Sequence, residues 1–474
     1  MVEGLARAAG LPVRAAAQVH IDGADPVVRT ALKVAETGAA AIAAAGMAAA
    51  WLWSQKQGDA PQEVRVNAAA AAAAMQSYKF LKIAGEPPGA VMDALTNFYR
   101  VKDGRWIYLH CNFPNLAARN CSVLGAQPTS ESIEARAAGW DGAALEEAIF
   151  AGGGCGALVR SEEEWRALPQ AAALRGLSPV ELVRIGDALK EPLPSGDRPL
   201  SGVRVLDLTR VLAGPTCAKT LAEHGADVLR ITRAGLPDSG VLDLDTGLGK
   251  LSAQLDLRDS AQLHTLRELV RGCDVFSQSY RPGTLDARGL SPHELAALRP
   301  GIVCVTLGAW GYTGPWQARR GYDTVVQAAN GMAWHPGGAR PAFLPVSAQD
   351  YVAGYLMAFG AMAALARRAE EGGSWLVRVS LAACGEWIRN HGRVVAGAWT
   401  SLPTQVPAEL VRRWVIESDS PFGTLTHLGP IASMPATPPR WDRPSVAAGA
   451  SPAEWPLRVH TSDLASPSSS TPCN

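Results

Sequence analysis

Cysteine and histidine are scarce in this chain of 474 residues, and neither follows a metal-binding pattern. The eight cysteines are scattered without a Cys-x-x-Cys pair, and the nine histidines show no ligand spacing. These absences argue against a zinc site and against a disulfide scaffold. We therefore expect no bound metal, and we expect reduced thiols in a cytoplasmic protein.

Net charge is also absent, because 44 Lys and Arg residues balance 44 Asp and Glu residues. Without a basic field, nucleic acid is not an expected partner. The longest apolar run, Ala39 to Trp53, is rich in alanine and too short to span a bilayer. We expect a buried helix over residues 31–53 and no membrane partner. Residues 1–10 lack the basic front and apolar core of a secretory signal, which fits a cytoplasmic location.

Three widespread sequence motifs are missing. The turn at residues 210–215 follows the first predicted strand of the most regular region, and it has one glycine where a dinucleotide fingerprint needs three. The sequence contains no Gly-x-Ser-x-Gly nucleophile elbow and no Walker Gly-Lys-Ser/Thr sequence. These absences argue against nicotinamide binding, against an α/β-hydrolase and against a P-loop enzyme.

The most regular region, residues 200–321, alternates buried strands with helices. Predicted strands occupy residues 203–208, 227–231, 273–276 and 302–307, and predicted helices occupy residues 216–224, 259–271 and 291–298. Such alternation predicts an α/β fold with a doubly wound, parallel, Rossmann-like sheet. Because ligands of these sheets bind beyond the carboxyl ends of the strands, the turns at residues 210–215, 232–233 and 279–283 carry candidate binding groups.

Changes in composition divide the chain into five segments. An Asp-Gly hairpin at Asp103 and Gly104 predicts that residues 95–190 form a smaller α/β domain. Residues 191–199, rich in Pro, Gly and Asp, predict a linker to the Rossmann-like domain, residues 200–390. Residues 391–474 lose periodicity and predict an extended C-terminal segment that ends in a disordered tail.

The remaining segment, residues 1–94, is predicted to be a partial first repeat. Its alanine-rich helix is followed by a polar turn, a short strand at residues 63–67 and an alanine run. The same order of parts, with nearly the same spacing, recurs from Asp350 to Trp387. In the first copy the position of Asp350 falls near Glu36 or Thr37, so a matching aspartate is missing there.

Asp350 precedes a long apolar run at the predicted start of a helix. Its carboxylate could cap the first turn by accepting a free amide hydrogen. The position also suits a nucleophile, because the helix N-terminus is expected to lower the pKa of the carboxyl and keep it ionised. The local pattern leaves both roles open.

An ordered series of short motifs resembles the family III CoA transferases of the CaiB/BaiF type. That family includes formyl-CoA and carnitine-CoA transferases and α-methylacyl-CoA racemase. The matching motifs occupy residues 199–215, 221–228, 279–283, 311–315, 321–323 and 327–331. The series reaches Asp350 where the family has its catalytic aspartate, and the resemblance covers most of residues 31–445.

The resemblance implies a CoA transferase with Asp350 as its nucleophile. In the family, the aspartate forms a mixed anhydride with the acyl group and then an aspartyl-CoA thioester, from which a carboxylic acid takes CoA. Coenzyme A is then a substrate and not a permanently bound cofactor, and Tyr322 approaches the thioester. Family members form interlocked dimers, so a homodimer is expected. By position, the CoA-binding residues are Leu212, Ala213, Arg233, Lys250, Ser279, Tyr280, Arg281 and Arg320.

The chain departs from the family pattern in its domain order, because the part that resembles the small domain precedes the Rossmann-like part. It therefore reads as a truncated first copy fused to a second, or as a permuted single copy. In addition, Thr232 stands where the family commonly has an acidic residue. An alternative function is an acyl-CoA racemase or other enolising enzyme. Racemases carry His where this chain has Tyr322, and a phenol is a poor base near neutral pH. A non-catalytic CoA-binding protein is the other alternative.

Overall fold

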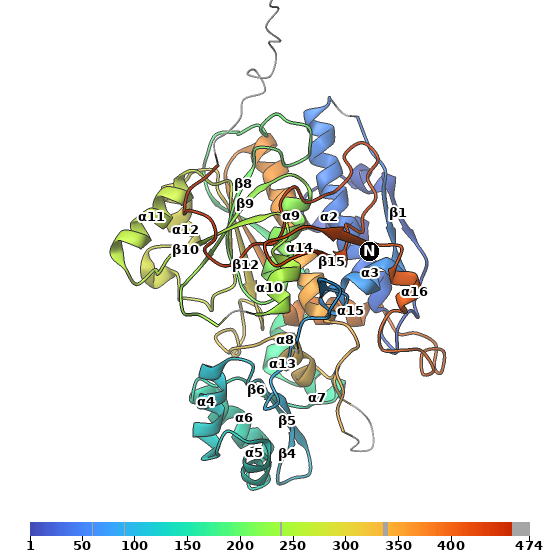
Figure 1. Cartoon of the computed structure of the whole chain (residues 1–474), viewed down its shortest axis with the longest axis vertical. Coiled ribbons are helices and arrows are strands. Elements are labelled where there is room, and N and C mark those ends of the chain that lie inside the picture. Colours follow the sequence, from blue (N-terminus) through green and yellow to red (C-terminus); the bar gives the residue numbers. More distant parts are fainter. Residues whose placement is uncertain (59, 90, 238, 335–339, 457–474) are drawn as a thin grey trace, which may run out of the picture.

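A seven-stranded sheet forms the centre of the large domain (Figure 1). The computed structural model describes residues 1–456 except 59, 90, 238 and 335–339. All neighbouring strands run parallel except the last pair, which is antiparallel. The predicted doubly wound parallel sheet is thus confirmed. In spatial order the strands are β10 (Lys250–Gln254), β9 (Asp227–Thr232), β8 (Arg204–Leu208), β11 (Val275–Gln278), β12 (Val303–Gly308), β13 (Ser374–Ser380) and β7 (Val180–Gly186).

Helices cover both faces of this sheet, as the alternating side chains of β8 show. Val205 packs into the core beside α9 and α14, whereas Leu206 and Leu208 pack into a separate core beside α11 and α12. Successive residues of a strand point to opposite faces, so an apolar strand needs a helical layer on each side. The four helices are α9 (Ala213–Glu223), α11 (Ser260–Arg271), α12 (Pro292–Leu298) and α14 (Ala348–Glu371).

Two strands of the sheet differ from the sequence prediction. β10 has the sequence Lys-Leu-Ser-Ala-Gln, in which polar and apolar residues alternate, and it pairs with β9 along its whole length. β7 lies within the range predicted for the small domain, yet it forms the edge of the large sheet beside β13. The predicted boundary at residue 190 therefore lies on the wrong side of β7.

The small domain is built on an antiparallel sheet of β4 (Asn97–Arg100), β5 (Trp106–Leu109) and β6 (Gly156–Leu158). The Asp-Gly turn joins β4 to β5 as predicted, and Gly104 takes a φ of +77° that favours glycine. A cluster of three tryptophans, Trp165, Trp310 and Trp316, packs this region against the large domain. The helices here are α4 (Pro114–Leu124), α5 (Ser130–Ala137), α6 (Gly142–Ala151), α7 (Glu162–Arg166) and α8 (Pro169–Leu174).

The N-terminal segment has the same order of elements as part of the second half of the chain. Strand β1 (Val19–Asp22) leads to α2 (Val34–Lys56), then to β2 (Val64–Asn67), which pairs parallel with β1, and to α3 (Ala68–Ala74). Likewise β12 leads to α14, then to its parallel neighbour β13 and to α15 (Leu381–Asn390). Helices α2 and α14 pack against each other in one core.

Helix α2 is longer than the apolar run suggested. Its 23 residues are long and apolar enough to cross a membrane, and 89% of its most apolar window is buried inside the fold. The buried helix expected over residues 31–53 is thus confirmed as residues 34–56. Its burial against α14 accounts for the alanine-rich sequence, since small side chains allow two helices to approach closely.

The C-terminal segment is more ordered than expected. Strands β14 (Val415–Ser418) and β15 (Leu425–Leu428) form a small antiparallel sheet with β3 (Lys82–Ile83). The chain then lies over the large domain, where the indole nitrogen of Trp441 donates to the Lys219 carbonyl and that of Trp455 to the Leu269 carbonyl. The predicted disordered tail, residues 462–474, lies outside the described residues. The remaining elements are α1 (Val2–Ala8), α10 (Val241–Thr246), α13 (Asp323–Ala329), α16 (Ala408–Val411) and the 3-10 helices η1 (Val13–Gln18), η2 (Ser77–Lys79) and η3 (Asp286–Arg288).

Candidate active site

A cleft of about 320 Å³ lies beyond the carboxyl ends of β8, β11 and β12. The turn after β8 contributes residues 210–213 to its lining, and the turn after β11 contributes residues 279–282. From β8 the chain continues to β9 and β10 on one side of β8, and then crosses to β11 and β12 on the other side. The cleft therefore lies at the point where the strand order reverses. Doubly wound sheets bind their ligands at this point.

Eight of the ten predicted site residues line this cleft. The other two, Arg233 and Lys250, are not among its lining residues. Arg233 is about one third exposed and lies 4.0 Å from Asp256. The eight residues that the fold brings together are Leu212, Ala213, Ser279, Tyr280, Arg281, Arg320, Tyr322 and Asp350.

Lys250 lies inside the large domain and not where the sequence placed it. Its side chain is 2% exposed, and Nζ donates to Oδ2 of Asp207 at 3.0 Å and to the carbonyl of Pro215 at 2.9 Å. The other oxygen of Asp207 accepts hydrogen bonds from the amide and the hydroxyl of Thr209, in the turn that leads to α9. Lys250 therefore stabilises the first turn of α9 from inside the fold. The sequence had instead predicted a contact between Lys250 and the phosphates of CoA.

The start of α14 is capped by Asp323 and not by Asp350. Oδ2 of Asp323 accepts the amide hydrogens of Gln349 at 2.9 Å and of Asp350 at 3.0 Å. The other oxygen of Asp323 accepts a hydrogen bond from Gln327. Ser347, the residue before the helix, makes no side-chain capping bond. Because Asp323 satisfies the free amides of the first turn, the Asp350 carboxylate is left to face the cleft.

Burial and one neighbouring carboxylate shift the pKa of Asp350. Burial and the negative charge of Asp323 raise the pKa of Asp350 well above its usual range. Burial also raises the pKa of Asp323, to about 6, although its hydrogen bonds oppose the shift. The expectation that the helix N-terminus lowers the pKa of Asp350 was wrong, because the amides that would stabilise its charge bind Asp323. A carboxylate with a raised pKa is a stronger nucleophile once it is ionised.

The same arrangement occurs at the start of α2, in the first repeat. The Asp25 carboxylate accepts the amide hydrogens of Ala35 at 3.3 Å and Glu36 at 2.9 Å. Glu36 is the third residue of α2, just as Asp350 is the third residue of α14. In the first repeat, however, Lys33 lies 3.3 Å from the Glu36 carboxylate. Of the two residues predicted to correspond to Asp350, Glu36 and Thr37, the structure therefore places Glu36 at the equivalent position.

Tyr322 is held by rings from the small domain. The His110 ring stacks on the Tyr322 ring with centroids 4.0 Å apart, and the Phe113 ring lies at 5.8 Å. Burial raises the pKa of Tyr322, so the phenol keeps its proton near neutral pH. Burial lowers the pKa of His110 to about 3, and neither ring nitrogen has a hydrogen-bond partner among the described residues. His110 and Phe113 were not predicted as site residues, because their only sequence signal is their place after β5.

The cleft is rich in positive charge. Four arginines line it, and Asp350 is the one acidic residue in the described part of its lining. Arg320 donates to the Gly153 carbonyl at 3.0 Å, and burial together with the charges of Arg281 and Arg119 lowers its pKa. Arg319 is already paired with Glu147. The remaining cationic groups suit an anionic ligand such as one that carries phosphates.

Close packing brings the turn after β8 next to the start of α14. A Cβ at Gly354 would lie 2.5 Å from the Ala213 carbonyl oxygen, so only glycine allows this approach of α14 to α9. Val211 has a φ of +74°, a strained conformation for a β-branched residue that often marks a functional turn. The turn therefore presents Leu212 and Ala213 to the cleft beside Asp350. Within the described ranges, no group of three or more His, Cys, Asp or Glu residues is placed to hold a metal ion.

The fold and the cleft together define an α/β protein with an arginine-lined cleft around a single carboxylate among the described residues. Comparison with known sequences gives the family: the model of CoA-transferase family III matches residues 13–181 and 200–391, which is more than half of the chain. The chain belongs to CoA-transferase family III.

The chain is similar to several named proteins. The acetyl-coenzyme A transferase nodX of Hypoxylon pulicicidum is 31% identical over 347 residues, which is 68% of this chain and 58% of that protein. Human succinyl-CoA:glutarate CoA-transferase is 34% identical over 181 residues, covering 35% of this chain and 41% of that protein. The crystal structure of Rv3272 from Mycobacterium tuberculosis has a TM-score of 0.38 at 30% identity, over 41% of this chain and 58% of that one. The chain spans about half the length of these relatives.

Proposed function

We propose that this chain transfers CoA from an acyl-CoA to a carboxylic acid, with Asp350 as the nucleophile. The observation that carries the proposal is the position of Asp350, the one acidic group among the described residues that line an arginine-rich cleft. The cleft lies at the reversal point of a parallel sheet, and relatives of the chain are named as acetyl-CoA and succinyl-CoA transferases.

The reaction would proceed by exchange of acyl bonds at one carboxylate. An Asp350 oxygen attacks the thioester carbonyl, the carbon–sulfur bond breaks, and a mixed anhydride and CoA thiolate result. The thiolate attacks the side-chain carbonyl of Asp350, which releases the first acid and leaves an aspartyl-CoA thioester. The acceptor carboxylate then displaces the thiolate to form a second anhydride. Attack of the thiolate on the acceptor acyl carbon yields the new acyl-CoA and free Asp350.

The residues around Asp350 supply binding and charge stabilisation. Tyr322 keeps its proton because burial raises its pKa, so it can donate a hydrogen bond to the oxygen that becomes negative during attack. The same protonated phenol cannot act as the base that a racemase needs. Arg281 and Arg320 lie where they could meet the phosphates of CoA. In this proposal coenzyme A is an exchangeable substrate of a cytoplasmic homodimer, and no other cofactor takes part.

The test is a mass spectrum of the protein after incubation with acetyl-CoA or succinyl-CoA. We expect one acyl or CoA adduct on Asp350, released by hydroxylamine, and no adduct in Asp350→Asn. Glu36→Gln is a matched control, because it removes the carboxylate at the same position of the first repeat. An adduct on another residue would reject this nucleophile. Exchange of the α-hydrogen of the substrate with solvent deuterium, without CoA transfer, would favour the enolising alternative.

A further inference from the structure

The N-terminal segment packs against the chain that leads into α14. The amide of Ser347, the residue before α14, donates to the Met75 carbonyl at 3.2 Å. The side-chain amide of Gln76 and the ammonium of Lys79 both donate to the Pro345 carbonyl, at 2.7 and 2.8 Å. Gln76 and Pro345 are 269 positions apart in the sequence, and Gln76 is fully buried. The N-terminal segment therefore fixes the path by which the chain enters α14.

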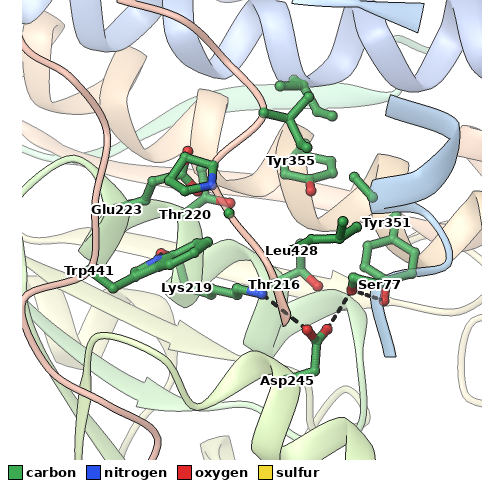
Figure 2. A pocket seen from close by; sticks show the side chains of 15 residues that line it. Ser77, Thr216, Lys219, Thr220, Glu223, Asp245, Tyr351, Tyr355, Leu428 and Trp441 are labelled. Atoms are coloured by element: carbon green, nitrogen blue, oxygen red, sulfur yellow. Dashed lines mark hydrogen bonds and ion pairs between the residues drawn. The ribbon is translucent and has the colours of Figure 1, made fainter. Parts of the chain in front are cut away.

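Ser77 joins the same segment to the first turn of α14 (Figure 2). Its hydroxyl donates to Oδ2 of Asp245 at 2.5 Å, and its oxygen lies 2.8 Å from the Tyr351 hydroxyl. The Asp245 side chain is 1% exposed and also accepts a hydrogen bond from Lys219 of α9 at 3.3 Å. Since the single proton of the Ser77 hydroxyl goes to the carboxylate, Tyr351 is the donor in the second bond. We call the chain of contacts from Tyr351 through Ser77 to Asp245 the Ser77 link.

The Ser77 link restrains the rotation of the first turn of α14. Tyr351 directly follows Asp350 and is 2% exposed, so its ring has little room to move. Because an α-helix turns by about 100° per residue, a fixed direction of one side chain sets the direction of its neighbour. The Asp323 cap holds two amides of the same turn, and the Ser77 link holds the turn from another side. The direction of the Asp350 carboxylate therefore depends on both.

The start of α2 is held by a matching contact from the other half of the chain. Val394, which follows α15, donates its amide hydrogen to the Ala31 carbonyl at 2.8 Å, just before α2. The residues that precede the two helices have the same backbone conformation, since Lys33 has a φ of −79° and a ψ of 62°, and Ser347 has a φ of −79° and a ψ of 63°. Each helix start is therefore anchored by residues that follow a helix of the other half of the chain.

The Ser77 link distinguishes the start of α14 from that of α2. Tyr351 is the fourth residue of α14, and Thr37 is the fourth residue of α2. The Thr37 hydroxyl donates to the Lys33 carbonyl at 2.8 Å, so it bonds back to the start of its own helix. A side-chain contact between the two halves is therefore not needed to start such a helix. It occurs at the helix whose acidic residue, Asp350, faces the cleft.

We propose that Ser77 and Tyr351 are positioning residues for Asp350, and that the Ser77 link aims its carboxylate at the thioester. This inference rests on the proposed transferase function, and it gives the N-terminal segment a part in that reaction. A shift of about 1 Å in a reacting group can cost roughly 100-fold in rate. Loss of the link should therefore slow the attack by Asp350. It should leave acyl-CoA binding unchanged, because none of the three linked residues is among the residues that line the cleft in the described structure.

The rate at which the Asp350 adduct forms tests the proposal. It is measured by rapid quenching and mass spectrometry over a range of concentrations of acetyl-CoA or succinyl-CoA, whichever modifies the wild-type chain. Ser77→Ala should lower the rate at saturation by about tenfold or more, while the half-saturating concentration stays within about twofold. Tyr351→Phe removes the same contact from the α14 side and should have a similar effect. Because the two residues act through one contact, adding Ser77→Ala to Tyr351→Phe should slow the reaction little further.

Asn67→Ala is the matched control for a loss of stability in the N-terminal segment. The exposed Asn67 side chain caps α3 by accepting the amide hydrogens of Ala69 at 3.0 Å and Ala70 at 3.1 Å. Its removal should lower the ratio of folded to unfolded protein about fivefold. The rate of adduct formation should nevertheless stay within about twofold of wild type, because the cap takes no part in the Ser77 link.

Each outcome decides the proposal. A rate for Ser77→Ala within twofold of wild type would overturn it and leave the proposed function standing. So would an equal loss of rate in Asn67→Ala, because lower stability alone would then explain the effect. If Ser77→Ala does not fold, the same criteria apply to Tyr351→Phe. Absence of any adduct in the wild-type chain would instead reject the proposed function, and this inference with it.

Discussion

Replacing Asp323 by asparagine or alanine tests how the start of α14 is built. The Asp323 carboxylate accepts the amides of Gln349 and Asp350 at 2.9 and 3.0 Å. Asparagine keeps an acceptor oxygen and caps helices about as well as aspartate, so Asp323→Asn should cost no more than about 1 kcal/mol of unfolding free energy. Alanine leaves both amides unpaired, and with a penalty of about 1–3 kcal/mol for each buried donor, Asp323→Ala should cost at least about 2 kcal/mol.

The same asparagine variant should change the pH dependence of the reaction. Burial is the larger cause of the raised pKa of Asp350, and the charge of Asp323 is the second. Removing that charge leaves burial alone, so the pKa of Asp350 falls. Because only ionised Asp350 can attack, the acid limb of kcat/KM for the acyl-CoA should move to lower pH in Asp323→Asn. The plateau at high pH should fall modestly, since a less basic carboxylate is a weaker nucleophile.

Two measurements decide this prediction. Urea unfolding of wild type, Asp323→Asn and Asp323→Ala gives the cost of the cap, and steady-state rates across pH give the acid limb. The Glu36→Gln variant, altered at the equivalent position of the first repeat, should leave the limb unchanged. An acid limb that stays in place or moves to higher pH in Asp323→Asn would refute the electrostatic coupling. Equal stability of the asparagine and alanine variants would refute the capping role.

Three further outcomes are expected. Asp350→Asn should lower turnover by several orders of magnitude, because the amide cannot form an anhydride, while CoA binding measured by calorimetry stays within a few-fold. His110→Phe should retain the ring stack on Tyr322 and most of the transfer rate, whereas His110→Ala should lose about 3 kcal/mol of stability in urea unfolding. Glu36→Gln should change stability by less than about 1 kcal/mol, because Glu36 is partly exposed, and intact-mass spectra should still show one adduct per chain. Full adduct formation by Asp350→Asn would contradict the expected loss of turnover. Equal stability of His110→Phe and His110→Ala would contradict the role of the ring stack. Loss of the adduct in Glu36→Gln would contradict the assignment of the adduct to Asp350.

The sheet could be predicted from the sequence because its central strands are short apolar runs separated by helices. Strands β8, β9, β11 and β12 each carry their own local signal, and their parallel pairing follows from the intervening helices. β10 is not an apolar run, since Lys250 and Ser252 are polar, yet both are buried in the sheet beside β9. Pairing across the sheet, and not local preference, makes this segment a strand.

The site residues divide in the same way. Those on the turns after β8 and β11 were predictable, because the fold alone brings such turns to one edge of the sheet. Lys250 was not, because its ion pair with Asp207 joins residues that are 43 positions apart and lie inside the fold. His110 comes from another domain, and its stack on Tyr322 depends on how the two domains pack. A charged residue at a position that matches the family motif therefore indicates a contact with the ligand only if its side chain reaches the cleft.

The two copies of the repeat separate the structural role of the carboxylates from their chemistry. Asp25 and Asp323 accept the same two amides at the start of α2 and α14, so this cap is a requirement of the helix in both copies. The third helical residue is acidic in both copies as well. Glu36, however, lies beside Lys33, whereas Asp350 lines a cleft with Tyr322 and arginines contributed by other elements. In the proposed mechanism, a carboxylate at this position of the helix is therefore not sufficient by itself. What distinguishes Asp350 is the supply of partners from the β8 and β11 turns and from the small domain, which the first copy does not provide to Glu36.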